Sequence, residues 1–167
     1  MSGWVPLHVH SHYSLLQATP SPEALARQAA AEGLTHLALT DTHALYGVVA
    51  FAQACRRHHV QPVIGMTIHI LNDGPYAPTP SMGASPPGTL VLLAQGVEGY
   101  RNLCRLSAQL HRDPQHHPQA TSLETLAQHA AGLLCITGGH CLPAGGAELP
   151  GGHGDEPALP APGRGGL

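Results

Sequence analysis

The feature that most constrains the fold of this chain is an alternation of apolar segments with two different periods. Short apolar runs of the kind found in buried strands cover residues 5–9, 35–39, 61–70, 89–93 and 133–137. Segments with helical spacing lie between them at 21–33, 45–57 and 99–111, and from 122 onward. Strands that alternate with helices predict an α/β fold with a parallel sheet, in which a functional site would lie at the carboxyl ends of the strands.

The first helix has the clearest predicted boundaries. Ser21 is a favourable N-cap, Pro22 suits the first helical position, and Glu23 places an acidic side chain in the first turn. Gly33 is a favourable residue at which to end the helix. These local signals predict a helix that begins after Ser21 and ends at Gly33.

The domain organisation follows from where these periods stop. The segment 72–88 holds five prolines, which predicts an irregular connection between two strands. From residue 143 the chain is rich in Gly and Pro and has no apolar period. Such a segment cannot bury enough surface to offset its ordering entropy. We therefore predict one folded domain at 1–142 and a disordered Gly/Pro-rich tail at 143–167.

Charge and hydropathy exclude several classes of protein. Seven Arg and no Lys stand against ten acidic residues, which gives a formal net charge of −3. We therefore expect no independent binding to nucleic acid, because the chain lacks a basic footprint. No apolar run approaches the roughly 20 residues that cross a bilayer, and the first residues do not resemble a charged leader. We expect a cytoplasmic protein without membrane contact.

The cysteines do not form a metal-binding or redox motif. None of the four is part of a Cys-x-x-Cys pair, and three of them fall within apolar periodic segments. Buried thiols in the core are the expectation. The four residues are Cys55, Cys104, Cys135 and Cys141.

Chemistry-bearing side chains gather at the ends of the first two predicted strands. His8 and His10 end the first strand, and Asp41 ends the second. Side chains two apart on a strand point to the same side, so both imidazoles are expected to face one site. Imidazole is the commonest ligand for transition metals near neutral pH. The pattern indicates a metallohydrolase, provided that further ligands follow.

Several blocks of residues resemble one known family. They are His8-Val9-His10-Ser11-His12, Ala38-Leu39-Thr40-Asp41, Pro62-Val63-Ile64-Gly65 and Glu98-Gly99-Tyr100-Arg101-Asn102-Leu103. These blocks resemble the polymerase and histidinol phosphatase (PHP) family, in the branch at the amino terminus of bacterial DNA polymerase III alpha subunits. The resemblance implies a distorted, TIM-like barrel of seven βα units, about five of them present here. It also implies a metal cluster at the strand ends and a cytoplasmic role in replication.

The resemblance also shows which metal ligands of the family are missing. His8 and His10 match ligand positions, and Asp41 is a third candidate. The other ligand positions fall on neutral residues, namely Gln17, Thr42, Thr67, Thr89 and Gly139, with His43 and His140 each one place from a ligand position. Clusters of closely spaced cations need negatively charged ligands. We therefore expect no catalytic residue and at most one weakly bound Zn²⁺ or Mn²⁺, at His8 and His10.

Three functions stay open at this point. The first is a noncatalytic PHP module that acts as a scaffold for the polymerase alpha subunit or docks a proofreading subunit. The second is a metal-dependent phosphoesterase or 3′–5′ proofreading exonuclease. The third is a truncated gene product without independent function, because the predicted barrel is incomplete. In structural terms, His8 and His10 could instead bond to backbone groups, and Asp41 could cap the helix predicted from Leu45.

Overall fold

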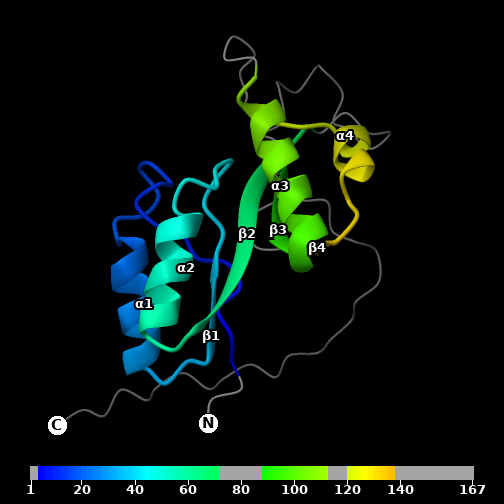
Figure 1. The fold of residues 1–167 in the computed structure, drawn as a ribbon. Helices are drawn as coiled ribbons and strands as arrows, with labels where there is room; N and C mark the ends of the chain where they lie inside the picture. Colours follow the sequence, from blue (N-terminus) through cyan, green and yellow to red (C-terminus); the bar gives the residue numbers. More distant parts are fainter. Residues whose placement is uncertain (1–3, 72–87, 113–119, 138–167) are drawn as a thin grey trace, which may run out of the picture.

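The computed structural model describes residues 4–71, 88–112 and 120–137 of the chain (Figure 1). These residues form a mixed α/β fold with four helices and four strands. In chain order the elements are α1 (Pro22–Ala31), β1 (His36–Leu39), α2 (Val48–Arg57), β2 (Gln61–Ile70), β3 (Gly88–Ala94), α3 (Gly96–Leu110), α4 (Leu123–Gln128) and β4 (Leu133–Thr137).

Most of the predicted elements are confirmed within a few residues. β2 and β4 have the predicted bounds, and α1 begins at Pro22 with the Ser21 hydroxyl accepting a hydrogen bond from the Ala24 N–H at 3.1 Å. α2 begins three residues later than predicted, at Val48, and α3 begins earlier, at Gly96. The predicted boundary at 142 and the tail 143–167 lie outside the described residues and stay predictions.

The prediction of a wholly parallel sheet is wrong. The strand order is β1-β2-β3-β4, and β1 pairs with β2 in parallel, but β2–β3 and β3–β4 are antiparallel. A parallel pair needs a crossover helix, and the sequence between β2 and β3 has no helical period. β4 begins at the end of the sheet where β3 ends, because Ala94 is paired with Leu133. The chain between the two strands contains α3 and α4. The contact of Gln95 N–H with the Gly132 carbonyl, at 2.7 Å, marks that end.

β2 joins the two halves of the sheet. Its first residues, 61–64, pair with β1, and its later residues, 65–70, pair with β3. Gly65 lies at the junction, where a Cβ atom would lie 2.5 Å from the Leu92 carbonyl oxygen. That close approach of backbones excludes any larger residue at this position.

The strand predicted at 5–9 is wrong as a regular element. This segment instead runs beside β1 and is joined to it by two backbone hydrogen bonds, from Ala38 N–H to the Pro6 carbonyl at 3.0 Å and from Thr40 N–H to the Val9 carbonyl at 2.8 Å. Pro6 cannot donate a hydrogen bond, which interrupts a continuous ladder. The segment still delivers His8 and His10 to the end of β1.

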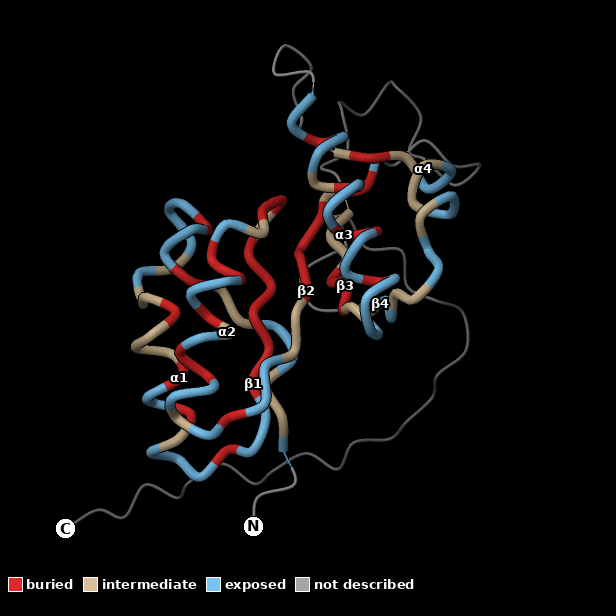
Figure 2. The backbone as a smooth tube through the Cα atoms, in the orientation of Figure 1, coloured by how far each residue is buried: buried red, intermediate tan, exposed pale blue. Residues whose placement is uncertain are grey.

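The core is divided between two helical layers. α1 and α2 pack together beside β1, around buried Phe51, Leu37 and Leu39, and α3 covers β2 and β3 around Met66 and Leu103. Figure 2 shows the buried residues along β1 and β2 and on the helix faces turned toward them. A third apolar cluster, made of Ala38, Val91 and Leu93, is formed by β1 and β3.

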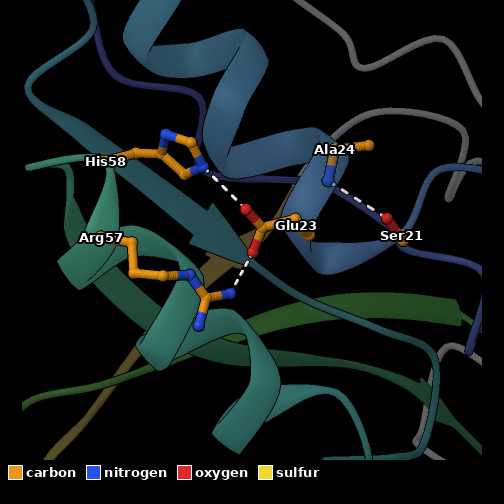
Figure 3. A network of polar contacts seen from close by, with 5 residues as sticks. All are labelled: Ser21, Glu23, Ala24, Arg57 and His58. Atoms are coloured by element: carbon orange, nitrogen blue, oxygen red, sulfur yellow. Dashed lines mark hydrogen bonds and ion pairs between the residues drawn. The ribbon is translucent and has the colours of Figure 1, made fainter.

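A polar contact ties α1 to α2 on the outside of the first layer. The Glu23 carboxylate accepts hydrogen bonds from the Arg57 guanidinium and, at 2.8 Å, from the His58 imidazole (Figure 3). Hydrogen bonds from these two side chains lower the pKa of Glu23 below its ordinary value. Because the side chains are exposed, the contribution of this contact to stability is small.

The prediction of core thiols holds for one of the three cysteines that are described. Cys55 is fully buried on α2, and burial raises the pKa of its thiol to about 11. Cys104 and Cys135 are exposed, so the prediction is wrong for them, and Cys141 lies outside the described residues. Apolar periodicity placed Cys104 in a helix without showing which face of that helix is buried.

In the part of the chain that is described, no helix is both long and apolar enough to span a membrane.

Candidate functional site

Two imidazoles meet at the carboxyl end of β1, as the His-x-His spacing predicts. The Nε2 atoms of His8 and His10 lie 2.8 Å apart, and the ring centroids are 4.8 Å apart with planes inclined by 52°. At this distance one Nε2 donates a hydrogen bond to the other, so the pair shares a proton rather than carrying two. The two histidines are therefore held together by their own contact.

His10 is held in place by a second contact at its other ring nitrogen. Its Nδ1 lies 3.0 Å from the Ser14 hydroxyl oxygen. The pKa of His10 is lowered, chiefly by burial and then by the neighbouring His8, and the nearby Asp41 charge opposes this shift only in part. Burial and the neighbouring imidazole therefore favour the neutral form of His10.

Asp41 serves a different purpose from the one predicted. The carboxylate is 1% exposed and accepts three hydrogen bonds, each 2.7 Å long, from the Ser11 N–H, the Ser11 hydroxyl and the Ser14 hydroxyl. The capping prediction is wrong, because α2 begins only at Val48 and its N-cap, Gly47, makes no side-chain capping bond. Asp41 instead fastens the loop after His10 to the end of β1.

Hydroxyl and amide groups surround the histidine pair at three of the positions predicted to have lost metal ligands. The Thr67 hydroxyl oxygen lies 3.3 Å from His8 Nε2 and donates to the Thr40 carbonyl at 2.8 Å. The Thr42 hydroxyl oxygen lies 3.4 Å from His10 Nδ1 and donates to the Gln17 amide oxygen at 2.6 Å. The neutral side chains of Gln17, Thr42 and Thr67 thus lie together around the pair His8 and His10.

Of the remaining positions singled out from the sequence, His43 reaches this group through its backbone, whose N–H donates to the Thr67 carbonyl at 2.8 Å. Thr89 is paired with His69 in the β2–β3 ladder. His43 is buried with a positive φ of 58°, and its Nε2 accepts a hydrogen bond from the His69 N–H at 3.1 Å. Gly139 and His140 lie outside the described residues.

Two residues of the site were not found by sequence reasoning. Ser11 and Ser14 supply every hydrogen bond that the structure gives to the Asp41 carboxylate, and Ser14 also accepts one from the Thr42 N–H at 3.0 Å. Both serines are buried, which is unusual for this residue type. Two serines within a polar loop gave no signal of their own, because their partner lies about thirty residues away in the sequence.

Comparison with protein families gives one decisive match, since residues 6–155 fit the model of the PHP domain. The chain belongs to the PHP family. Among the relatives of this PHP chain, the "DNA polymerase III subunit alpha" of Chlamydia trachomatis is 33% identical over 134 residues, 80% of this chain and 11% of its own length. The "Error-prone DNA polymerase" of Pseudomonas aeruginosa is 37% identical over 158 residues, 95% of this chain and 13% of its own length. This PHP chain therefore spans about a tenth to an eighth of these relatives.

The described residues of this site do not supply the ligands of a metal cluster. Within residues 4–71, 88–112 and 120–137, no three His, Cys, Asp or Glu side chains are grouped so that they could hold a metal. A catalytic Zn²⁺ takes three protein ligands and a structural one takes four. Two nitrogens on a tetrahedral Zn²⁺ would lie about 3.3 Å apart, whereas the 2.8 Å between the two Nε2 atoms is a hydrogen-bond distance. Asp41 has its oxygens occupied by serine donors.

Proposed function

We propose that this chain is a noncatalytic PHP module of a bacterial replicative polymerase of the DNA polymerase III alpha type. Its role in this proposal is structural: it supports the polymerase polypeptide or docks a proofreading subunit. The support comes from the family match, from relatives named as polymerase subunits, and from the neutral site. A TIM-like relationship of the fold and the cytoplasmic location belong to the same proposal, but the count of about five βα units does not, because β3 pairs antiparallel with both β2 and β4.

The observation that carries the proposal is that the buried polar side chains of the site form hydrogen bonds with one another. Among the described residues of the site, Asp41 is the one carboxylate, and it accepts three hydrogen bonds. Within the described part of the chain, no buried side-chain nitrogen or oxygen lacks a hydrogen-bond partner. A site built for metal leaves ligand atoms free to coordinate, whereas here serine and threonine hydroxyls fill that role.

The same arrangement argues against phosphoester hydrolysis. That chemistry uses metal ions to activate water and to stabilise the leaving oxygen, and closely spaced cations require negative ligands. An imidazole ligand brings no negative charge, and the hydroxyls of Thr42 and Thr67 are poor ligands beside carboxylates. We therefore propose no catalytic residue. Any bound metal would be a single weakly held Zn²⁺ or Mn²⁺ at the two histidines.

One experiment tests the absence of catalysis. Purified protein is analysed for bound metal and then assayed for 3′–5′ exonuclease activity with added Mn²⁺ or Zn²⁺. The expected result is substoichiometric metal and no activity above that of His8→Ala. Stoichiometric metal, together with an activity that His8→Ala abolishes, would overturn the proposal in favour of the phosphoesterase or exonuclease.

A second experiment tests the scaffold role. The tagged chain is mixed with the remaining polypeptide of the polymerase from the same genome, and the complex is isolated. We expect a stable complex and a rise in the thermal midpoint of the partner, because binding to the native state stabilises it. If the partner folds and the two do not associate, the scaffold role is refuted and the view of a truncated product is favoured.

A further inference from the structure

A cleft with a volume of about 480 Å³ lies where α2 ends and β2 begins. Gln61, at this end of β2, is paired with His36, the first residue of β1. The histidine pair of the candidate site follows the other end of β1, so the cleft and the histidine pair lie at opposite ends of this strand. We call it the α2–β2 cleft, and the residues that line it are Ala52, Arg56, His59, Val60, Gln61 and Pro62.

The α2–β2 cleft combines donors of hydrogen bonds with apolar surface. The Arg56 guanidinium presents five N–H groups in a planar fork, which matches the oxygens of a phosphate or a carboxylate. The His59 imidazole and the Gln61 amide add further donors, and the other three lining residues are apolar. Small-molecule sites typically have volumes of about 300–1,000 Å³ and unite apolar lining with a few polar groups. The size and the lining of the cleft therefore suit a small organic ligand.

The side chains of Arg56 and His59 are exposed and stay available to a ligand. Their neighbours Arg57 and His58 are turned toward Glu23 on α1 and bonded to it (Figure 3). Among the described residues, no side chain forms a hydrogen bond or an ion pair with the side chain of Arg56 or His59. One turn of chain thus holds two cationic side chains that bind within the fold and two that line the cleft.

Local charge favours an anionic ligand. The stretch 42–72, which supplies every lining residue, contains no Asp or Glu. The acids that bracket it in the sequence are Asp41, at the other end of β1, and Asp73, which follows the far end of β2 and lies outside the described residues. The carbonyls at the end of α2 carry only a partial negative charge and accept backbone hydrogen bonds, so the full charge of Arg56 outweighs them.

His59 occupies a backbone position that glycine normally fills. It follows the C-cap of α2 with a positive φ of 57°, and the Val60 N–H donates to the Cys55 carbonyl at 2.9 Å, as in a Schellman motif. The left-handed conformation is unfavourable for a residue that has a Cβ atom. An imidazole is therefore held at the cleft against the local preference of the backbone, and strain of this kind points to a function of the side chain.

We propose that the α2–β2 cleft binds a small organic dianion, supplied by a phosphomonoester or by a dicarboxylate. Arg56 binds the charged oxygens through its fork, His59 donates a further hydrogen bond, and the apolar lining contacts the organic part. Two cationic side chains favour a dianion over a monoanion, and a phosphomonoester carries a charge of about −1.5 to −2 near pH 7. This activity goes beyond the scaffold role, does not depend on it and needs no metal ion.

The test is isothermal titration calorimetry of the full chain with phenyl phosphate and with phthalate, in metal-free buffer. We expect saturable binding, and the tighter of the two probes identifies the phosphomonoester or the dicarboxylate as the ligand class. Arg56→Gln should weaken binding about 10- to 150-fold, as the loss of a hydrogen bond between charged groups requires. Arg57→Gln is the matched control, because it removes the same charge one residue away from a side chain that is bonded to Glu23. It should bind within about twofold of the wild type, since distant exposed charges are screened.

His59→Gly separates a ligand role of the imidazole from a purely structural one. Because glycine adopts a positive φ without strain, this variant should have a higher thermal midpoint than the wild type. The same variant should bind the tighter probe about 2- to 10-fold more weakly, which is the loss of one hydrogen bond. A raised midpoint with unchanged binding would show that the imidazole takes no part in the cleft and would overturn its role there.

Three results would overturn the proposal as a whole. The first is no saturable binding of either probe by the folded wild type, and the second is equal binding by Arg56→Gln, with circular dichroism as the check of folding. The third is a loss of binding in His8→Ala but not in Arg56→Gln, which would place the dianion at the histidine pair. Benzoate, a monoanion with the same ring, should bind at least about tenfold more weakly than the tighter probe. Equal binding of benzoate would refute the preference for a dianion.

Discussion

Replacement of Ser14 by Ala tests whether hydrogen bonds, rather than a metal, hold the site together. Ser14 is 2% exposed, donates to Asp41 at 2.7 Å and accepts from the Thr42 N–H at 3.0 Å. A hydrogen bond to a charged group contributes about 1.5–3 kcal/mol, and a neutral one contributes about 0.5–1.5 kcal/mol. The hydroxyl also accepts a hydrogen bond from His10 Nδ1 at 3.0 Å, so the sum predicts a loss of about 2.5–6 kcal/mol, a large fraction of the roughly 5–15 kcal/mol typical of a domain.

Urea unfolding monitored by circular dichroism measures this loss. With a slope of about 2 kcal/mol per molar urea, the midpoint should fall by roughly 1–3 M. Ser107→Ala is the matched control, because its hydroxyl makes one neutral hydrogen bond, to the His43 carbonyl at 3.0 Å. That variant should lose only about 0.5–1.5 kcal/mol.

Two results would refute this reasoning. One is a loss in Ser14→Ala no larger than that in Ser107→Ala, which would mean that the contact with Asp41 contributes nothing beyond a neutral bond. The other is a large fall in the wild-type midpoint when EDTA is added. Because binding to the native state stabilises it, such a fall would reveal a tightly held metal.

Three other predictions follow from single features of the fold. Gly65→Ala should destabilise the chain by about 1–3 kcal/mol in urea unfolding, because its Cβ would lie 2.5 Å from the Leu92 carbonyl oxygen. The pKa of Glu23 is lowered from its ordinary value of 4.5, so its stabilising effect should be present above that value and lost as the pH falls through the lowered pKa. In Glu23→Gln this pH-dependent part of the stability is absent, so its thermal midpoint should fall less than that of the wild type over the same pH range. Iodoacetamide should label exposed Cys104 but not buried Cys55 in the native state, as mapped by mass spectrometry, and the reverse pattern would contradict the packing of α2.

Local signals explain which parts of the fold could be predicted. Ser21 and Pro22 mark the start of α1 through contacts within four residues, and β2 is identified by a long apolar run. The direction of β3 could not be obtained in this way, since it depends on pairing between residues such as Gly65 and Leu93. Strand direction is set by tertiary contacts, which leave no trace in a window of a dozen residues.

In the candidate site, too, the features set by neighbouring residues could be predicted and those set by distant residues could not. His8 and His10 are two residues apart, so their meeting follows from strand geometry. The capping role predicted for Asp41 is wrong. Its carboxylate accepts hydrogen bonds from serine hydroxyls about thirty residues earlier in the chain instead of capping a local helix. Sequence alone shows that a carboxylate lies at a strand end, but it does not show which groups donate hydrogen bonds to that carboxylate.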